Sequence, residues 1–152
     1  MGLFKKKQVF CAPCSGSIIP LCEVSDVVFA SETLGPGFAI IPSIGELYAP
    51  KNGVISAIFP TKHAVGMTFE DGSEVLFHIG IDTVNLQGEG FSTFVNSGDK
   101  VKQGSKLVDF DLPFLESKSI DSTVMVVFTK HKEVSIEPKT VQANEVLDIT
   151  CE

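Results

Sequence analysis

Residues 63–82 read HAVGMTFEDGSEVLFHIGID, in which two apolar runs flank an Asp71-Gly72 pair. Asp-Gly is a strong signal for a two-residue type I′ hairpin loop, because both central residues of that turn need a positive φ. The flanking runs are rich in Val, Ile and Phe and alternate with other residues, which is typical of half-buried β-strands. This stretch predicts an antiparallel hairpin with one face in a hydrophobic core.

A two-residue loop would set the pairing of the whole hairpin. Glu70 would face Ser73. Counting outward, Val65 would face His78, and His63 would lie diagonal to His78. Such diagonal neighbours share a face and lie about 7 to 8 Å apart at the backbone. We therefore expect the two imidazoles to meet, whereas a three-residue loop would send them to opposite faces.

Alternation along the second strand predicts a core face and an outer face. The core face carries four apolar residues, Val75, Phe77, Ile79 and Ile81. The outer face carries Leu76, His78, Gly80 and Asp82. Because glycine leaves space beside His78, we expect an open surface that another molecule can approach.

The rest of the chain also favours β-structure. Short apolar segments recur about every ten residues between Gly, Pro, Asn and Asp, which is typical of a sandwich or barrel. The Ala-Pro-x-x-Gly-x-Ile pattern of residues 12–18 recurs at 49–55, and residues 101–107 are echoed at 141–147. The prediction is an all-β antiparallel sandwich or barrel with a duplicated motif and short helical turns near 27–33 and 112–119. A tail of residues 1–8 would precede a single domain at 9–152.

Composition limits the function. Twelve lysines, no arginine and 19 acidic residues give a net charge of −7, which argues against a nucleic-acid role. Because the chain has no guanidinium group to bind phosphate through two hydrogen bonds, phosphoryl chemistry would rely on imidazole, hydroxyls, backbone amides or a partner's arginine. No apolar run approaches the roughly 18 residues that span a bilayer, and no signal peptide is evident. We expect a cytoplasmic, free-standing monomer whose membrane association is only indirect.

The four cysteines are Cys11, Cys14, Cys22 and Cys151. Cys11-Ala12-Pro13-Cys14 has the spacing of a redox pair or of half a zinc site. A turn and short strand are expected after it, however, rather than the helix N-terminus that lowers a redox thiol's pKa. Cys22 and Cys151 supply no second close pair for zinc. The cysteines are interpreted as small packing residues.

Two adjacent imidazoles have a distinctive chemistry. Both cannot easily be protonated, and apolar neighbours such as Leu76 and Phe59 disfavour the charged form further. One neutral ring can then accept a phosphoryl group while the other donates a hydrogen bond to its oxygens. Thr61 could add a hydroxyl on the same face. His131, between two lysines, is interpreted as solvated.

Two other functions compete with phosphoryl transfer. The histidines and Asp82 could ligate zinc in a β-sandwich hydrolase, although such peptidases take a third protein ligand from a His-x-His and His78 is followed by Ile79-Gly80. Residues 98–104 look like the turn and strand of lipoyl and biotinyl carrier domains. Those carriers need a lysine flanked by Met or by Asp and Ala, and no such lysine occurs here.

Four blocks of sequence resemble a known family. DVVFA at 26–30, PTKH at 60–63, HIGIDTVNLQGEGF at 78–91 and FDL at 110–112 are similar to signature blocks of glucose-type enzyme IIA of the bacterial phosphoenolpyruvate:sugar phosphotransferase system. The resemblance covers nearly the whole chain. It implies a β-sandwich with a duplicated half-motif.

The resemblance also implies roles for the site residues. His78 corresponds to the phosphorylated histidine and His63 to a second histidine that helps to pass the phosphoryl group on. Thr61, Gly80 and Asp82 match supporting positions. The implied donor is the phosphocarrier HPr, and the implied acceptor is a cysteine on the IIB domain of a sugar permease. No cofactor is implied, although the family shows zinc held between the two histidines and a partner's carboxylate.

A shallow apolar docking face, with positive charge brought by the partner, is a further implication of the resemblance. The expected members of this face are Val27, Val28, Phe29, Leu34, Phe59 and Leu76. The amphipathic membrane tail of the enteric glucose protein is nearly missing from this chain. Regulatory roles tied to that tail are not expected here.

Overall fold

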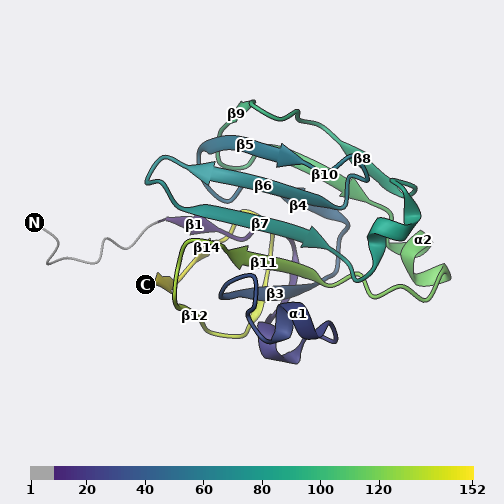
Figure 1. Cartoon of the computed structure of the whole chain (residues 1–152), viewed down its shortest axis with the longest axis horizontal. Coiled ribbons are helices and arrows are strands. Elements are labelled where there is room, and N and C mark those ends of the chain that lie inside the picture. Colours follow the sequence, from purple (N-terminus) through teal and green to yellow (C-terminus); the bar gives the residue numbers. More distant parts are fainter. Residues whose placement is uncertain (1–8) are drawn as a thin grey trace, which may run out of the picture.

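The computed structural model describes residues 9–152, and the predicted tail at 1–8 lies outside them. An eight-stranded sheet with the order β13-β2-β3-β11-β7-β6-β5-β9 packs against a three-stranded sheet with the order β4-β10-β8. In Figure 1, β5, β6, β7, β11 and β3 cross the front of the molecule. All strand pairings are antiparallel, which confirms the predicted all-β class.

The strands are β1 (Phe10–Cys11), β2 (Gly16–Pro20), β3 (Gly37–Pro42), β4 (Glu46–Tyr48), β5 (Gly53–Ile58), β6 (Ala64–Phe69), β7 (Glu74–Ile79), β8 (Phe91–Thr93), β9 (Lys100–Val101), β10 (Lys106–Phe110), β11 (Val124–Phe128), β12 (Val134–Ile136), β13 (Thr140–Val141), β14 (Val146–Leu147) and β15 (Ile149–Cys151). The helical segments are η1 (Leu21–Glu23), α1 (Val27–Ala30), η2 (Thr83–Leu86) and α2 (Leu112–Ser117). The two α-helices fall where short helical turns were predicted. Within residues 9–152, no helix is long and apolar enough to cross a membrane.

The main core lies between the two sheets. Val75, Phe77 and Ile79 of β7 are at most 2% exposed there, as alternation predicted. Burying a side chain of this size contributes about 1.5 to 3 kcal/mol. Ile81, predicted for the same face, instead packs against a second apolar cluster. The positive φ of Gly80 (+77°) ends the alternation just before it.

The second cluster lies on the outer face of the large sheet, beneath the η1–α1 segment. Its buried members are Leu21, Val24, Phe29, Ala39, Met125 and Val127, and Leu76 packs against it. Figure 1 shows α1 at the lower edge of this face. The η1–α1 segment therefore forms one wall beside the outer side of β7.

The predicted duplication is visible in the backbone hydrogen bonds. The Cys11 amide donates to the Pro50 carbonyl (3.0 Å). Its counterpart, the Tyr48 amide, donates to the Pro13 carbonyl (2.8 Å). The strands that follow repeat the arrangement, since β2 pairs with β13 and β5 pairs with β9. The two Ala-Pro segments therefore meet at a local two-fold axis.

The β6–β7 turn differs from the prediction. Its loop has three residues, because the Phe69 amide donates to the Ser73 carbonyl (2.9 Å) and the Gly72 amide donates back to Phe69 (3.0 Å). The carboxylate of Asp71 accepts from the amide of Ser73 (2.9 Å), an Asx-type bond that stabilises this three-residue loop. Gly72 alone takes the positive φ (+86°) that such a loop requires. The predicted two-residue loop is wrong, and the register moves by one residue.

Candidate functional site

His63 and His78 lie side by side, with ring centroids 4.8 Å apart and planes at 79°. In the shifted register His78 faces Ala64 rather than Val65, so the predicted pairing is wrong. The rings meet because His63 precedes the first residue of β6 and follows Lys62, which has a φ of +62°. The strand alternation therefore does not govern His63. The predicted meeting of the rings is confirmed, but not through the predicted pairing: the His63 carbonyl accepts from the Ile79 amide (2.7 Å).

A backbone hydrogen bond determines the tautomer of His78. Its Nδ1 lies 2.9 Å from the Gly80 carbonyl oxygen. A carbonyl can only accept, so Nδ1 carries the proton and Nε2 keeps a lone pair in the neutral ring. Gly80 does not leave the open space that was predicted, because a Cβ there would lie 2.5 Å from Cγ2 of Thr83. Its role in the geometry is to turn its carbonyl back toward the imidazole.

The His63 ring is held by a hydroxyl and an aromatic ring. Thr61 Oγ1 lies 2.7 Å from His63 Nδ1. When the hydroxyl donates, the His63 proton lies on Nε2, where it can be donated to a phosphoryl oxygen. The Phe59 ring packs edge-on against the imidazole with centroids 5.6 Å apart. His63 is only 3% exposed, so its orientation is well determined by its surroundings.

Both imidazoles are neutral at pH 7. Burial, followed by the charge of the neighbouring His63, lowers the pKa of His78 to about 4. Burial also lowers the pKa of His63 from its ordinary value. The carboxylates of Asp26 and Asp82 act in the opposite direction on His78 but do not outweigh burial. The expected neutral pair is therefore present.

Asp26 is a site residue that the sequence analysis did not single out. Its carboxylate caps α1 by accepting from the Val28 amide (2.9 Å), and it lies close enough to His78 to affect its pKa. The available signal was an Asp directly before an apolar run, which is a common N-cap pattern. Asp82, which was predicted, is exposed and begins η2 with a φ of +59°. Two carboxylates thus act electrostatically on the histidine.

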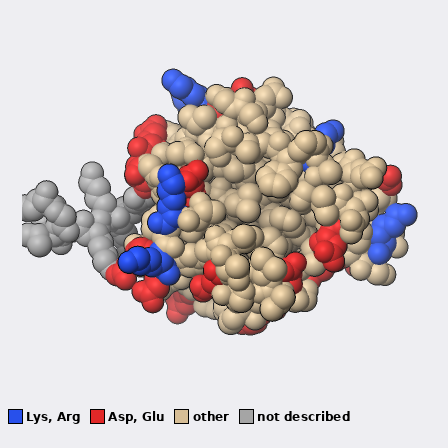
Figure 2. Space-filling view, viewed as in Figure 1, with Lys and Arg blue, Asp and Glu red and all other residues tan. Residues whose placement is uncertain are grey.

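The residues predicted for an apolar docking face separate into two groups. Four are exposed at the surface: Val27 (74%), Val28 (45%), Leu34 (43%) and Phe59 (42%). Phe29 is only 6% exposed, and its ring packs 4.8 Å from that of His78. Leu76 is half-buried in the same outer cluster. Figure 2 shows the middle of this outer face built mostly of uncharged side chains, with charged ones around its rim.

The metal and redox alternatives lack the residues they need. In the part of the chain that the structure describes, no group of three or more His, Cys, Asp and Glu side chains could hold a metal ion. The proposed zinc hydrolase thus has no complete ligand set. All four cysteines are free. Burial raises the pKa of Cys14 to about 12, whereas redox chemistry requires an accessible thiolate.

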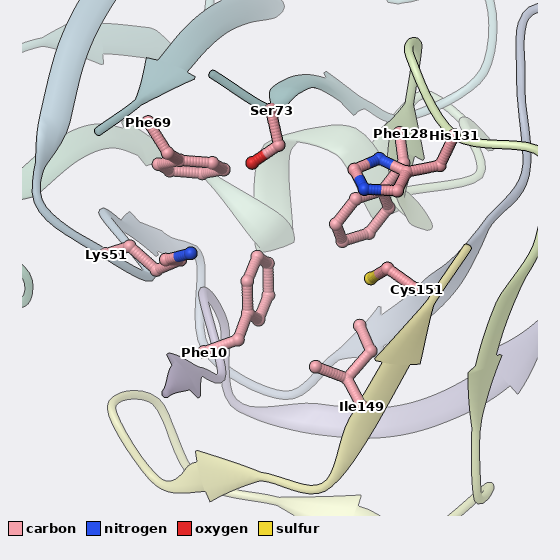
Figure 3. A pocket seen from close by; sticks show the side chains of 8 residues that line it. All are labelled: Phe10, Lys51, Phe69, Ser73, Phe128, His131, Ile149 and Cys151. Atoms are coloured by element: carbon pink, nitrogen blue, oxygen red, sulfur yellow. The ribbon is translucent and has the colours of Figure 1, made fainter. Parts of the chain in front are cut away.

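His131 is not the solvated residue that was predicted. Its Nδ1 is buried without a hydrogen-bond partner, and its ring packs edge-on against Phe128 with centroids 5.7 Å apart. Together with Lys51, Cys151 and others it lines a cavity of about 80 Å³ (Figure 3). This cavity lies at the Phe69–Ser73 end of the β6–β7 hairpin, the end opposite His78. The third histidine is therefore no part of the candidate site.

Comparisons with known proteins agree with this geometry. The family model for the phosphoenolpyruvate-dependent sugar phosphotransferase system, EIIA 1, matches residues 8–134. The glucosamine-specific EIICBA component of Bacillus subtilis is 45% identical over 130 residues, which cover 86% of this chain and 21% of that protein. The glucose-specific EIICBA component of Staphylococcus saprophyticus is 40% identical over 141 residues, covering 93% of this chain and 20% of that protein.

A solved structure is similar over the full length. Glucose permease IIA from Mycoplasma capricolum superposes with a TM-score of 0.88 at 40% identity, covering 98% of this chain and 99% of that one. The chain spans about a fifth of the length of the two curated relatives, so it matches their IIA portion alone. The hydrolase and lipoyl-carrier alternatives find no support in these similarities. The chain belongs to the EIIA 1 family of the phosphoenolpyruvate-dependent sugar phosphotransferase system.

Proposed function

We propose that this chain is a phosphocarrier that takes a phosphoryl group from phosphorylated HPr on Nε2 of His78 and passes it to the IIB domain of a sugar permease. The observation that carries the proposal is the 2.9 Å bond between His78 Nδ1 and the Gly80 carbonyl, next to a second neutral imidazole. That bond leaves the Nε2 lone pair as the nucleophile at pH 7.

The transfer requires little chemistry from the protein. The Nε2 lone pair of His78 forms a bond to phosphorus as the bond from phosphorus to the donor atom breaks, and the electron pair of that bond stays with the donor. Nδ1 keeps its proton, and its bond to the Gly80 carbonyl stabilises the positive charge that the ring gains on phosphorylation. His63, oriented by Thr61, donates from Nε2 to a phosphoryl oxygen. The same steps in reverse order deliver the group to the IIB cysteine.

The surroundings of His78 favour a partner that brings positive charge. Asp26 and Asp82 place two carboxylates near the phosphorylated ring, and the chain has no arginine of its own to offset them. A basic partner docked on the exposed apolar residues Val27, Val28 and Phe59 would supply that compensation while excluding water. HPr and IIB would use the same face in turn, because both must reach one nucleophile.

The remaining properties follow from the same proposal. We infer that the chain works as a monomer in the cytoplasm and needs no cofactor for the transfer. The two histidines are two of the four ligands that a zinc ion takes. Zinc would therefore bind between this chain and a partner that contributes a carboxylate, and it would have no catalytic role.

The test is incubation with phosphoenolpyruvate, enzyme I and HPr, followed by mass mapping. One acid-labile phosphoryl group should appear on His78 and should be transferred on addition of a IIB domain. His78→Ala should remain unlabelled, while His131→Ala should be labelled like the unaltered protein. Labelling of His78→Ala, or no labelling of the unaltered chain, would contradict the proposal.

A further inference from the structure

Thr83 is a buried polar residue beside the site that the transfer steps do not use. It is 0% exposed, and its Oγ1 donates to the carbonyl of Ile79 (2.5 Å). That carbonyl and the Gly80 amide belong to one peptide group. The Gly80 amide donates to the Thr123 carbonyl (2.8 Å), so this peptide is held at both ends. Of these two hydrogen bonds, the one from Thr83 comes from a side chain and the one to Thr123 is between backbone groups.

The next peptide carries the carbonyl that His78 uses. Its amide end is held directly, since the Ile81 amide donates to the Asp121 carbonyl (2.9 Å). Its direction also depends on the φ and ψ of Gly80, which glycine by itself restricts very little. Cγ2 of Thr83 fills the space next to Gly80, 2.5 Å from where a Cβ would be. Thr83 therefore holds the Ile79 peptide through its hydroxyl, while its methyl group only packs against Gly80.

We propose that Thr83 is a positioning residue for phosphoryl transfer: its hydroxyl holds the Ile79 peptide so that the Gly80 carbonyl keeps the His78 proton on Nδ1 and the lone pair on Nε2. The kinetic part of this inference rests on the proposed function. The tautomer part does not, because it concerns the unphosphorylated protein. A threonine that merely satisfied the Ile79 carbonyl would affect stability and leave the His78 tautomer unchanged.

The experiment compares two substitutions that differ in the hydroxyl. Thr83→Val keeps the shape of the side chain and removes the donor, whereas Thr83→Ser keeps the donor and removes Cγ2. The His78 tautomer is read from two-bond ¹H–¹⁵N correlations of the imidazole, without any phosphoryl donor. We expect Nδ1–H in the unaltered protein and in Thr83→Ser. In Thr83→Val the ratio should shift toward Nε2–H by about threefold to tenfold, the size expected for one lost hydrogen bond.

The kinetics provide a second measurement. In Thr83→Val, kcat for phosphoryl transfer from HPr should fall by about the same threefold to tenfold, with KM unchanged, because docking does not involve this buried residue. Thr83→Ser, which keeps the hydroxyl, should have the same kcat as the unaltered protein. Thr68→Val, which removes a half-buried hydroxyl from β6, serves as the matched control and should change neither quantity.

The outcomes are distinguishable. A folded Thr83→Val that keeps the Nδ1–H tautomer and full kcat would overturn the inference. If Thr83→Val does not fold, Thr83→Cys retains a weak donor and should give an intermediate tautomer ratio; an unchanged ratio would again count against the role. If no variant and not even the unaltered chain accepts phosphate, the proposed function fails, while the tautomer ratio still decides the role of Thr83.

Discussion

The imidazole rings of His63 and His78 lie 4.8 Å apart and nearly perpendicular, although the two residues are not paired in the β6–β7 ladder. His78 is part of a regular strand, whereas His63 ends the turn that precedes one. One ring is therefore positioned by the sheet and the other by a turn with a left-handed residue at Lys62. This difference allows the two rings to be perturbed separately.

Replacing His63 should separate phosphoryl acceptance from delivery. The amide of His63→Gln can still donate to a phosphoryl oxygen but cannot exchange a proton or share charge as an imidazole does. We expect phosphorylation by HPr to stay within about threefold and delivery to IIB to slow by on the order of a hundredfold, the lower end for a lost acid–base group. Rapid-quench single turnovers measure the two steps. Equal effects on both steps would contradict this division of roles.

The lowered pKa of His78 predicts a pH dependence of stability. Between pH 6.5 and about 4 the unfolded chain binds a proton that the folded chain does not, so the free energy of unfolding falls as pH drops through this range. A shift from 6.5 to about 4 corresponds to about 3 kcal/mol. Urea unfolding at pH 7.0 and 4.5 should therefore show a larger loss for the unaltered protein than for His78→Gln. Parallel losses would rule out a neutral, half-buried His78.

Gly80 and Gly72 form a matched pair for testing how closely Thr83 packs against the backbone at Gly80. Both have positive φ, +77° and +86°, but a Cβ at Gly80 would meet Thr83 and one at Gly72 would meet nothing within 4 Å. Gly72→Ala should cost about 1 kcal/mol in free energy of unfolding, from its backbone alone. Gly80→Ala should cost at least about 1 kcal/mol more, because its new methyl group would also clash with Cγ2 of Thr83. Adding Thr83→Ser, which removes the clashing Cγ2, should recover part of the difference.

A charge placed on the apolar face should weaken docking without unfolding the protein. Val27 is 74% exposed beside the site, and Val146 is 62% exposed on β14. We expect Val27→Lys to raise KM for HPr by about tenfold, the effect of roughly 1.4 kcal/mol at an interface, because its charge repels a basic partner, and to leave thermal unfolding unchanged. Val146→Lys should change neither KM nor thermal unfolding. Equal KM values for the two variants would place the docking face elsewhere.

The net charge of −7 predicts that association with a basic partner depends on salt. Stopped-flow association rates should fall steeply as NaCl rises from about 0.05 to 0.5 M, because the Debye length shrinks from above 10 Å to a few Å. Asp82→Asn should make this dependence shallower. Glu137→Gln, which neutralises an exposed carboxylate just after β12, should alter it less. Rates that do not change with salt would argue against electrostatic steering.

Most of the fold was predictable because it depends on local patterns. Alternation placed Val75, Phe77 and Ile79 in the core, and the two Ala-Pro echoes correctly indicated a duplicated β-motif. The neutral histidine pair followed from residue types and proximity. Ile81 and His131 were placed wrongly, because a positive φ at Gly80 and a distant cavity wall are not visible in short-range periodicity.

The hairpin shows how a correct conclusion can rest on a wrong register. Asp71-Gly72 signals a tight turn, but the carboxylate of Asp71 also bonds the amide of Ser73, and this favours a three-residue loop. A shift of one residue inverts which side chains share a face. The rings still meet, because the chain turns at Lys62 before it enters β6.

The sequence by itself indicated a β-sandwich and two imidazoles suited to phosphoryl transfer. Its lack of arginine indicated that a partner must bring the positive charge. The tertiary structure was needed to bring Asp26, the N-cap residue of α1, near His78, to pack Thr83 against Gly80, and to place the His78 proton on Nδ1. The physical reason is that strand periodicity acts between residues two apart. Burial and the orientation of the peptides around Gly80, in contrast, depend on segments tens of residues away, such as Asp121 and Thr123.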